Sequence, residues 1–443
     1  MARISILLVF FAFLAQYSCS ENQLSNSVRD VSSVNEQMSL KPAEDSSSTR
    51  NKASVRPFAG QVQSYSGFLS VEPKYNAKLF YWFFEKQTDP NNAPIMLWLY
   101  GEIGRSSMLS VFEENGPYVL VKDKVVLREH SWTKEFNMLY IDSTVGTGYS
   151  TANSTNAYPK TSQQAAAYLY TALKEFFSIY DSYNKAPVYL AGEYYATKII
   201  ISLANLIRKE NSAAKVKIEL KKVCLGAGHI DPVNQQRRAE FLYQVGVVDP
   251  VGKAEVIKFE DAAHKAMLER KYGKAKSHTN GVDRKIKRAG YAPPVDAAEP
   301  KYDLSSYKAT IKFFESKDKR QDLHAGDAKF QDKPRPVLKY IRDDLHTSSS
   351  KELVEVLQQY STRMYTGQYD MVVPTSQYDQ VIERLPWDYT MDFSQKSRNN
   401  WYINGKLAGY FKWYKNLYQI MVRQANHFVA RSQPYVTMKA CLL

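Results

Sequence analysis

The sequence predicts an α/β protein in which a mostly parallel sheet is flanked by helices. Three observations support this class. Short apolar, β-prone runs alternate with stretches of helical pattern and length, an order typical of parallel sheets. With 44% hydrophobic and 13% aromatic residues, a chain of 443 residues can bury a large core. One long, basic and helical stretch interrupts the alternation, which indicates an insertion between two parts of the core.

The expected elements follow from these runs in chain order. Helices are predicted over 161–180 and 195–208, where the apolar pattern is helical. The predicted strands cover 67–71, 79–84, 95–100, 138–142, 187–191, 223–228, 362–365 and 418–422.

Between about residues 235 and 330 the strand signals vanish, and low-hydrophobicity helical sequence takes over. The chain is therefore divided into a signal peptide (1–20), a disordered segment (21–56), a first core part (57–234), a helical cap insertion (235–336) and a second core part (337–443).

The N-terminus has the pattern of a secretory signal. Arg3 supplies the positive start, an apolar run follows from Ile4 to Ala15, and Ser20 offers a small residue for cleavage. No later run reaches the roughly 20 apolar residues of a transmembrane helix. We expect an exported, soluble protein, with a lysosomal or vacuolar location as the alternative. Residues 21–56 are too polar to fold alone.

The formal net charge is +14, and much of it gathers between Lys265 and Arg288. The simpler interpretation is a solvated surface. The alternative is an anion-binding patch for acidic glycans, membranes or an acidic protein. Nucleic acid is not an expected partner, because the chain carries an export signal and no recognition motif.

Cleavage of the signal would leave two cysteines, Cys224 and Cys441. Cys224 lies in an apolar run and is predicted to be a small buried hydrophobe. Two thiols without a histidine cluster do not suggest a zinc site, so no metal and no cofactor are expected. Asn153 begins an Asn-Ser-Thr glycosylation acceptor in a polar loop.

The most informative segment is 192–196, Gly-Glu-Tyr-Tyr-Ala, between the 187–191 strand and the following helix. A strand, a tight turn and a helix with small residues around one central side chain form the nucleophile elbow of α/β-hydrolases. Here the central residue is Tyr194 instead of serine. Taken alone, the pentapeptide is more often a plain strand-to-helix turn.

Ordered motifs from about Ser66 to the C-terminus resemble those of the serine carboxypeptidases, and most closely those of the vitellogenic-like branch. The resemblance implies an α/β-hydrolase fold with a cap and catalytic residues in the order Ser, Asp, His. The motifs are 98–107 (WLYGEIGRSS), 114–118 (ENGPY), 142–150 (DSTVGTGYS), 192–196 (GEYYA), 226–232 (GAGHIDP), 365–370 (YTGQYD), 426–429 (NHFV) and 433–434 (QP).

The resemblance assigns the triad positions residue by residue. Asp370 matches the aspartate, His427 matches the histidine, and Tyr194 stands at the nucleophile position. A tyrosine has a pKa of about 10 and is mostly neutral at physiological pH. Its oxygen would also lie several ångströms beyond that of a serine, whereas acyl transfer needs a narrowly placed attacking atom. We therefore predict a site without peptidase activity.

Two nearby motifs also depart from the family pattern. In the family's Asn/Gln-Gly-Gly-Pro-Gly loop, Tyr100 replaces the amide residue, Glu102 a glycine and Ile103 the proline. Near His427, residues 424–426 stand where the family has glycines, and Ala430 stands where it has a proline.

Glu114 and Glu193 match the paired acids that bind a peptide's terminal carboxylate at acidic pH in the family. The simpler interpretation is a pair that braces the sheet edge. The resemblance also places Tyr100, Gly101, Glu102 and Tyr195 in the substrate site. A further set of histidines is interpreted as isolated, in surface or satisfied core positions: His229, His264 and His278.

The sequence thus predicts a secreted, non-catalytic serine carboxypeptidase homologue with a binding or storage role. The expected ligands are a peptide C-terminus or an acidic protein or glycan, and the family resemblance allows a homodimer. The alternative is an active serine-type carboxypeptidase. Because the strained elbow conformation has no catalytic use without a nucleophile, the backbone at Tyr194 is expected to relax partly from it.

Overall fold

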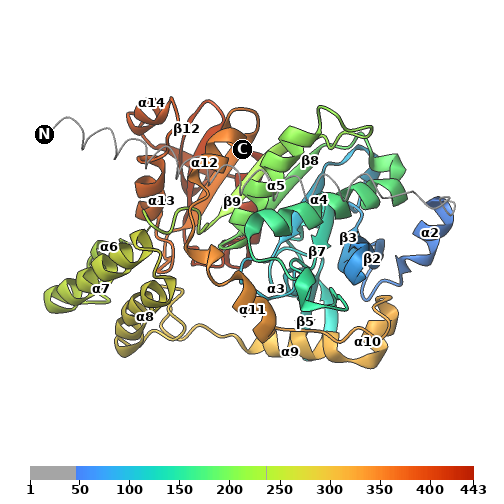
Figure 1. Cartoon of the computed structure of the whole chain (residues 1–443), viewed down its shortest axis with the longest axis horizontal. Coiled ribbons are helices and arrows are strands. Elements are labelled where there is room, and N and C mark those ends of the chain that lie inside the picture. The colour runs from blue at the N-terminus through green and yellow to red at the C-terminus, as the bar shows by residue number, and fades with distance from the viewer. Residues whose placement is uncertain (1–45, 236) are drawn as a thin grey trace, which may run out of the picture. The chain divides into compact units, whose positions relative to one another are not determined.

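A computed structural model describes residues 46–235 and 237–443, and its centre is one large β-sheet (Figure 1). The sheet has eleven strands in the order β1-β2-β3-β7-β4-β8-β9-β10-β13-β12-β11. The strands are β1 (Ser54–Val55), β2 (Ser64–Glu72), β3 (Ala77–Phe84), β4 (Ile95–Leu99), β7 (Asn137–Ile141), β8 (Val188–Glu193), β9 (Leu220–Gly226), β10 (Ser361–Gly367), β11 (Asn399–Ile403), β12 (Lys406–Tyr414) and β13 (Leu417–Val422).

The centre of the sheet is parallel, from β7 through β4, β8, β9 and β10 to β13. Antiparallel strands extend it at both edges. Central strands such as β4 are buried along their whole length, as expected for a parallel sheet covered on both faces. The predicted α/β-hydrolase class is confirmed, and all eight predicted strands are present.

Two hairpins were not predicted from the sequence. Strands β11 and β12 form one of them at the edge of the large sheet. A separate hairpin joins β5 (Tyr118–Val121) to β6 (Lys124–Leu127). All four strands have mixed or exposed faces, which weakens the apolar signal that identifies a strand.

Helices flank the sheet, and the two predicted helices are both present. Helix α4 packs on β2 and α5, α5 packs on β8, β9 and α12, and α16 packs on β9, β10 and β13. The helices outside the 235–336 segment are α2 (Ser46–Lys52), α3 (Met108–Glu113), α4 (Ser162–Ile179), α5 (Ala196–Glu210), α12 (Ser350–Leu357), α13 (Thr375–Ile382), α14 (Thr390–Ser394), α15 (Val429–Ser432) and α16 (Pro434–Leu442).

The described part of segment 235–336 contains helices and no strands. Helices α6 to α8 bury a small apolar cluster of their own that includes Leu242, Val256 and Ile286. Helices α9 and α10 instead pack on the main core, to which Phe314 and Leu323 belong. The helices are α6 (Ala239–Gln244), α7 (Pro250–Leu268), α8 (Tyr272–Arg288), α9 (Ser305–Glu315) and α10 (Lys317–Asp322), and α11 (Arg335–Ile341) begins at its end.

The predicted disordered segment, 21–56, requires a correction at its end. Residues 1–45, and with them the predicted signal peptide, lie outside the described residues. However, α2 begins at Ser46, and β1 pairs with β2 through Ser54 and Val55. Backbone hydrogen bonding to an existing sheet edge orders this polar sequence, which could not form a core alone. The predicted boundary at residue 56 is therefore too late.

Three observations bear on other expectations from the sequence. Cys224 and Cys441 are both buried free thiols. The side chain of Asn153 is exposed, while its backbone N–H donates to the Tyr75 carbonyl. None of the helices in 46–235 and 237–443 is both long enough and apolar enough to cross a membrane.

Candidate functional site

The turn between β8 and α5 keeps the strained backbone of a nucleophile elbow. Tyr194 has φ +47°, in the left-handed region that non-glycine residues seldom adopt. Its N–H donates to the Gly226 carbonyl, and its carbonyl accepts from His229 N and from Thr197 N and Oγ1. The predicted relaxation is therefore wrong. Backbone hydrogen bonds to the sheet and to α5 hold this turn whatever side chain it carries.

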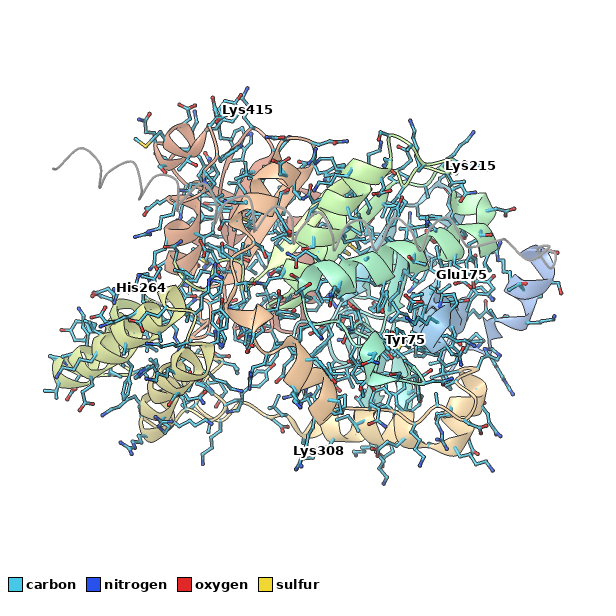
Figure 2. The ribbon with its side chains drawn as sticks, in the orientation of Figure 1. Tyr75, Glu175, Lys215, His264, Lys308 and Lys415 are labelled. Carbon is cyan, nitrogen blue, oxygen red and sulfur yellow. The ribbon has the colours of Figure 1, made fainter. Side chains whose placement is uncertain are left out.

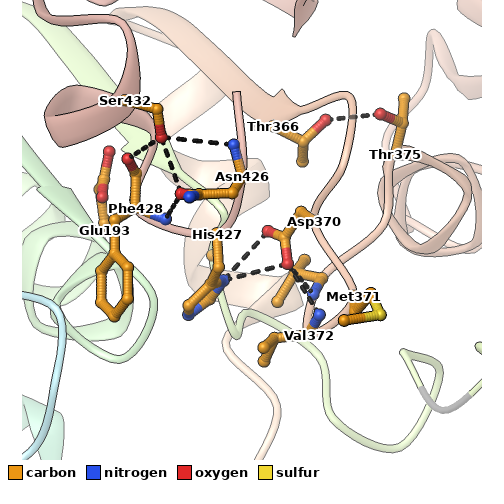
Figure 3. Close-up of polar contacts among 12 residues, drawn as sticks. Glu193, Thr366, Asp370, Met371, Val372, Thr375, Asn426, His427, Phe428 and Ser432 are labelled. Carbon is orange, nitrogen blue, oxygen red and sulfur yellow. Dashed lines mark hydrogen bonds and ion pairs between the residues drawn. The ribbon is translucent and has the colours of Figure 1, made fainter. Parts of the chain in front are cut away.

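His427 and Asp370 form the hydrogen-bonded pair that the sequence predicts (Figure 3). Asp370 follows β10 and is fully buried, and His427 follows β13 and is 8% exposed. The Nδ1 atom of His427 lies 3.0 Å from Oδ2 and 3.2 Å from Oδ1 of Asp370. Oδ1 of Asp370 also accepts from the backbone N–H groups of Val372 and Val373 at 2.7 and 2.8 Å. This bonding positions the imidazole at the mouth of the elbow.

The ring of Tyr194 lies between two histidines. Its centroid is 5.3 Å from that of His427, in an edge-on arrangement, and 5.3 Å from that of His229. The interpretation of His229 as an isolated histidine is therefore wrong. The residue follows β9, and the parallel pairing of β8 with β9 places it beside the elbow.

No hydrogen bond joins the Tyr194 hydroxyl to His427 or to any other described residue. Similarly, no serine, threonine or cysteine side chain among the described residues hydrogen-bonds to the His427 imidazole. Burial, assisted by the negative charge of Asp283, raises the pKa of Tyr194 to about 12, so the phenol is neutral. Among the residues that the structure describes, the arrangement holds an imidazole and a carboxylate but no attacking group hydrogen-bonded to the imidazole.

The loop after β4 meets the elbow backbone directly. The N–H of Tyr195 donates to the Gly101 carbonyl at 3.1 Å. A Cβ atom on Gly101 would lie 2.7 Å from the Glu193 carbonyl oxygen, so only glycine fits this position. In α/β-hydrolases, the N–H of the residue after the nucleophile is one of the oxyanion donors. Here this N–H already has an intramolecular partner.

The side chains that replace the family residues in this loop have partners of their own. The Tyr100 hydroxyl donates to the Tyr307 hydroxyl on α9 at 3.0 Å. Glu102 forms ion pairs with Arg105, at 2.7 Å, and with Lys333. These bonds connect the loop to α9 and to the segment before α11.

The paired acids Glu114 and Glu193 are both buried in the wall of the site. Glu114 Oε2 accepts from Ser110 Oγ at 2.6 Å and from Trp98 Nε1 at 3.0 Å. Glu193 Oε1 accepts from Ala430 N at 2.9 Å and from the Tyr365 hydroxyl at 3.2 Å. Burial raises the pKa of Glu114 to about 7. The pKa of Glu193 is raised well above its usual range by burial and by the charge of Glu114.

A cavity of about 400 Å³ opens over these groups. It is lined by seven of the predicted site residues, namely Tyr100, Gly101, Glu102, Glu114, Glu193, Tyr194 and His427. Asp370 lies behind His427 and does not line the cavity. Tyr195 is also outside the cavity. Its hydroxyl points to Asp344 instead and donates to Oδ2 at 2.8 Å. Asn153 belongs to a separate surface loop.

Several residues of the cavity wall were not predicted from the sequence. Arg238 and Asp283 form an ion pair of 3.1 Å. Arg105 stacks on the Tyr307 ring, 5.3 Å from its centroid. Most of these residues come from the 235–336 segment, whose residues carry no motif that could have identified them. Among the described residues, no group of three or more His, Cys, Asp or Glu side chains is arranged to hold a metal ion.

Comparison with known proteins identifies the family. A profile of the serine carboxypeptidases matches residues 56–441. The chain belongs to the serine carboxypeptidase family. It is 31% identical over 396 residues to a venom serine carboxypeptidase of Apis mellifera, covering 87% of this chain and 85% of the relative. It is 30% identical to the vitellogenic carboxypeptidase of Aedes aegypti, covering 97% and 96%.

A solved carboxypeptidase structure has the same fold. The prohormone-processing carboxypeptidase Kex1(Δ)p of Saccharomyces cerevisiae matches with a TM-score of 0.77, 19% sequence identity, and coverage of 88% of this chain and 94% of that one. A likeness at this identity supports the fold alone. The family expectation stated from the sequence motifs is confirmed.

Proposed function

We propose that this chain is a serine carboxypeptidase homologue that binds peptide C-termini without cleaving them. The observation that carries the proposal is the side chain at the elbow. Tyr194 occupies the nucleophile position, and its hydroxyl makes no hydrogen bond to His427. A nucleophile and its base must lie within hydrogen-bond reach for acyl transfer.

The loop after β4 supports the same conclusion independently. The Tyr195 N–H that would stabilise an oxyanion donates to Gly101. Loss of one oxyanion donor typically lowers turnover by about 10²–10³-fold. Loss of a triad serine lowers it by about 10⁶-fold. Two separate features of the described residues, the side chain at position 194 and the bond of Tyr195 N, thus support the absence of catalysis.

The binding part of the proposal rests on the cavity and its two acids. Because burial raises the pKa of Glu114 to about 7 and raises that of Glu193 well above its usual range, the pair holds protons under mildly acidic conditions. A protonated carboxyl group can donate a hydrogen bond to a ligand's carboxylate, whereas an ionised pair would repel it. Affinity for a free C-terminus should therefore increase as the pH falls. The export signal and the Asn153 acceptor fit a glycosylated protein that is secreted or lysosomal.

Activity is tested with a fluorophosphonate probe and with blocked dipeptides, between about pH 4 and pH 7. We expect no covalent labelling and no turnover above that of buffer. Labelling at any residue of the cavity would overturn the proposal. Tyr194→Ser should restore little activity, because Tyr195 N and the 100–105 loop remain as they are. Strong rescue would show that Tyr194 alone blocks catalysis.

Binding is tested by calorimetry with short peptides that differ only at the terminus, free acid against amide. We expect the free acid to bind at least tenfold more tightly at acidic pH. Glu114→Gln with Glu193→Gln replaces the acids by uncharged amides that donate as the protonated acids do, so the preference should persist at neutral pH, where the wild type loses it. Asp388→Asn, at an exposed carboxylate, is the matched control. Equal affinity for acid and amide would exclude a carboxylate site.

The second candidate is an active carboxypeptidase. The observation in its favour is the Asp370–His427 pair, whose geometry is that of a working dyad. The probe experiment above decides between the two, because a working enzyme must be labelled or must turn over a dipeptide.

A further inference from the structure

The outer face of helix α8 carries a row of unpaired cations. The helix has six lysines and arginines and one acid, Asp283. Lys276, Asn280, Arg284 and Lys287 are all exposed. Their spacing of four, four and three residues places them on one side of the helix. The row from Lys276 to Lys287 is about 16 Å long at 1.5 Å per residue.

The charges of this row are not neutralised by neighbouring acids. No ion pair joins Lys276, Arg284 or Lys287 to an acid within residues 46–235 and 237–443. Two other charged residues of α8 have ion-pair partners of their own. Lys285 pairs with Glu255 of α7, and Asp283 pairs with Arg238 on the cavity side. The positive potential of the row is therefore directed at solvent.

We propose that this face of α8 binds a linear sulfated polysaccharide. A row of cations along one line matches the repeating charges of a linear polyanion better than a single small anion. Guanidinium and ammonium groups bind such oxyanions through charge-assisted hydrogen bonds. A peripheral membrane site would also need apolar side chains to insert, and none of the exposed large apolar side chains of the described residues lies on α8.

The row is separate from the peptide site, although both use the same helix. Thr279 and Asp283 are half-buried and line the cavity, whereas the residues of the row are exposed and do not line it. Figure 1 shows α7 and α8 side by side as a helical hairpin. Polysaccharide binding can therefore be tested without reference to peptide binding.

The test is retention of the full chain on immobilised heparin, measured as the salt concentration of elution. The variant carries Lys276→Gln, Arg284→Gln and Lys287→Gln, which keep good helix formers on exposed positions. The control carries Lys209→Gln, Lys215→Gln and Lys217→Gln, three exposed cations at the end of α5 and before β9. Figure 2 shows Lys215 far from His264 on the α7–α8 hairpin. The two variants lose the same net charge.

We expect the wild type and the control to elute together and the α8 variant to elute at lower salt. The slope of log affinity against log salt should fall by about two to three, roughly one ion for each lost contact. Desulfated heparin should retain none of the proteins. Equal shifts in both variants would indicate adsorption by net charge and would overturn the proposal, as would stronger binding to phosphatidylserine vesicles than to heparin.

A second measurement needs no variant. Acetylation of lysines, followed by peptide mapping, should show Lys276 and Lys287 protected by bound heparin and Lys215 and Lys217 unprotected. Uniform protection of all four, or none at Lys276 and Lys287, would overturn the proposal even if the triple variant failed to fold.

Discussion

The site residues that match the family and those that depart from it differ in their hydrogen bonding to the backbone. In the half of the site that matches the family, Asp370 and Glu193 accept hydrogen bonds from backbone N–H groups as well as from side chains. In the half that departs from it, Tyr194 and Glu102 project into the cavity. The Tyr194 hydroxyl has no partner within the described chain, and Glu102 is paired with charges on partly exposed side chains.

This contrast suggests why one half retains family residues and the other does not. A buried acceptor that completes the backbone hydrogen bonding of the fold is costly to remove, whether or not it catalyses. A side chain that only faces a cavity can change at little cost to stability. Substitutions in the two halves should therefore differ in their cost to stability.

Asp370→Ala should reduce the free energy of unfolding by about 3–5 kcal/mol, because it leaves three buried donors, Val372 N, Val373 N and His427 Nδ1, without their acceptor. Chemical denaturation measures the change. Asp388→Ala, at an exposed aspartate, is the control and should change stability by less than about 0.5 kcal/mol. Similar small changes in both variants would contradict the structural role of Asp370.

Glu114 should make stability depend on pH. Folding raises its pKa from 4.5 to about 7, mainly through burial, so the folded state binds this proton more tightly than the unfolded state. The resulting stabilisation is fully present below pH 4.5 and is lost as the pH rises to about 7.

The stability difference between wild type and Glu114→Gln should therefore fall by about 2–3 kcal/mol between mildly acidic and neutral pH. The opposite contribution of His229, whose pKa burial lowers to about 3, is present in both proteins and cancels in this difference. Parallel stability curves for the two proteins would show that Glu114 ionises normally.

Gly101→Ala should destabilise the protein by about 1–3 kcal/mol, since its Cβ would lie 2.7 Å from the Glu193 carbonyl oxygen and would push the loop away from the elbow. Thermal melting measures the effect. The matched control is Gly273→Ala on α8, where a Cβ meets no atom within 4 Å and the helix should gain slightly in stability. Equal melting temperatures for wild type and Gly101→Ala would mean that the contact relaxes freely.

Tyr194→Phe should change the free energy of unfolding by less than about 0.5 kcal/mol, because the hydroxyl it removes has no hydrogen-bond partner in the described chain. The ring contacts with His229 and His427 remain. A loss above 1 kcal/mol in chemical denaturation would reveal a structural bond to this hydroxyl.

Local sequence patterns were enough to predict the alternating elements and the replacement at the elbow. Strand β8, helix α5 and the turn between them follow from an apolar run, a helical run and small residues, all within about twenty positions of one another. The motifs around Asp370 and His427 identified that pair because each keeps the family's local spacing.

The remaining features of the site come from contacts that the local sequence does not encode. The tertiary structure placed His229 against Tyr194, engaged Tyr195 N with Gly101, kept the elbow at φ +47°, and brought Arg238 and Asp283 into the cavity wall. Each of these features depends on contacts between segments far apart in the chain, through strand pairing or helix packing. The periodicity of a sequence predicts which face of a helix or strand is buried, but it does not predict which distant residues that face contacts.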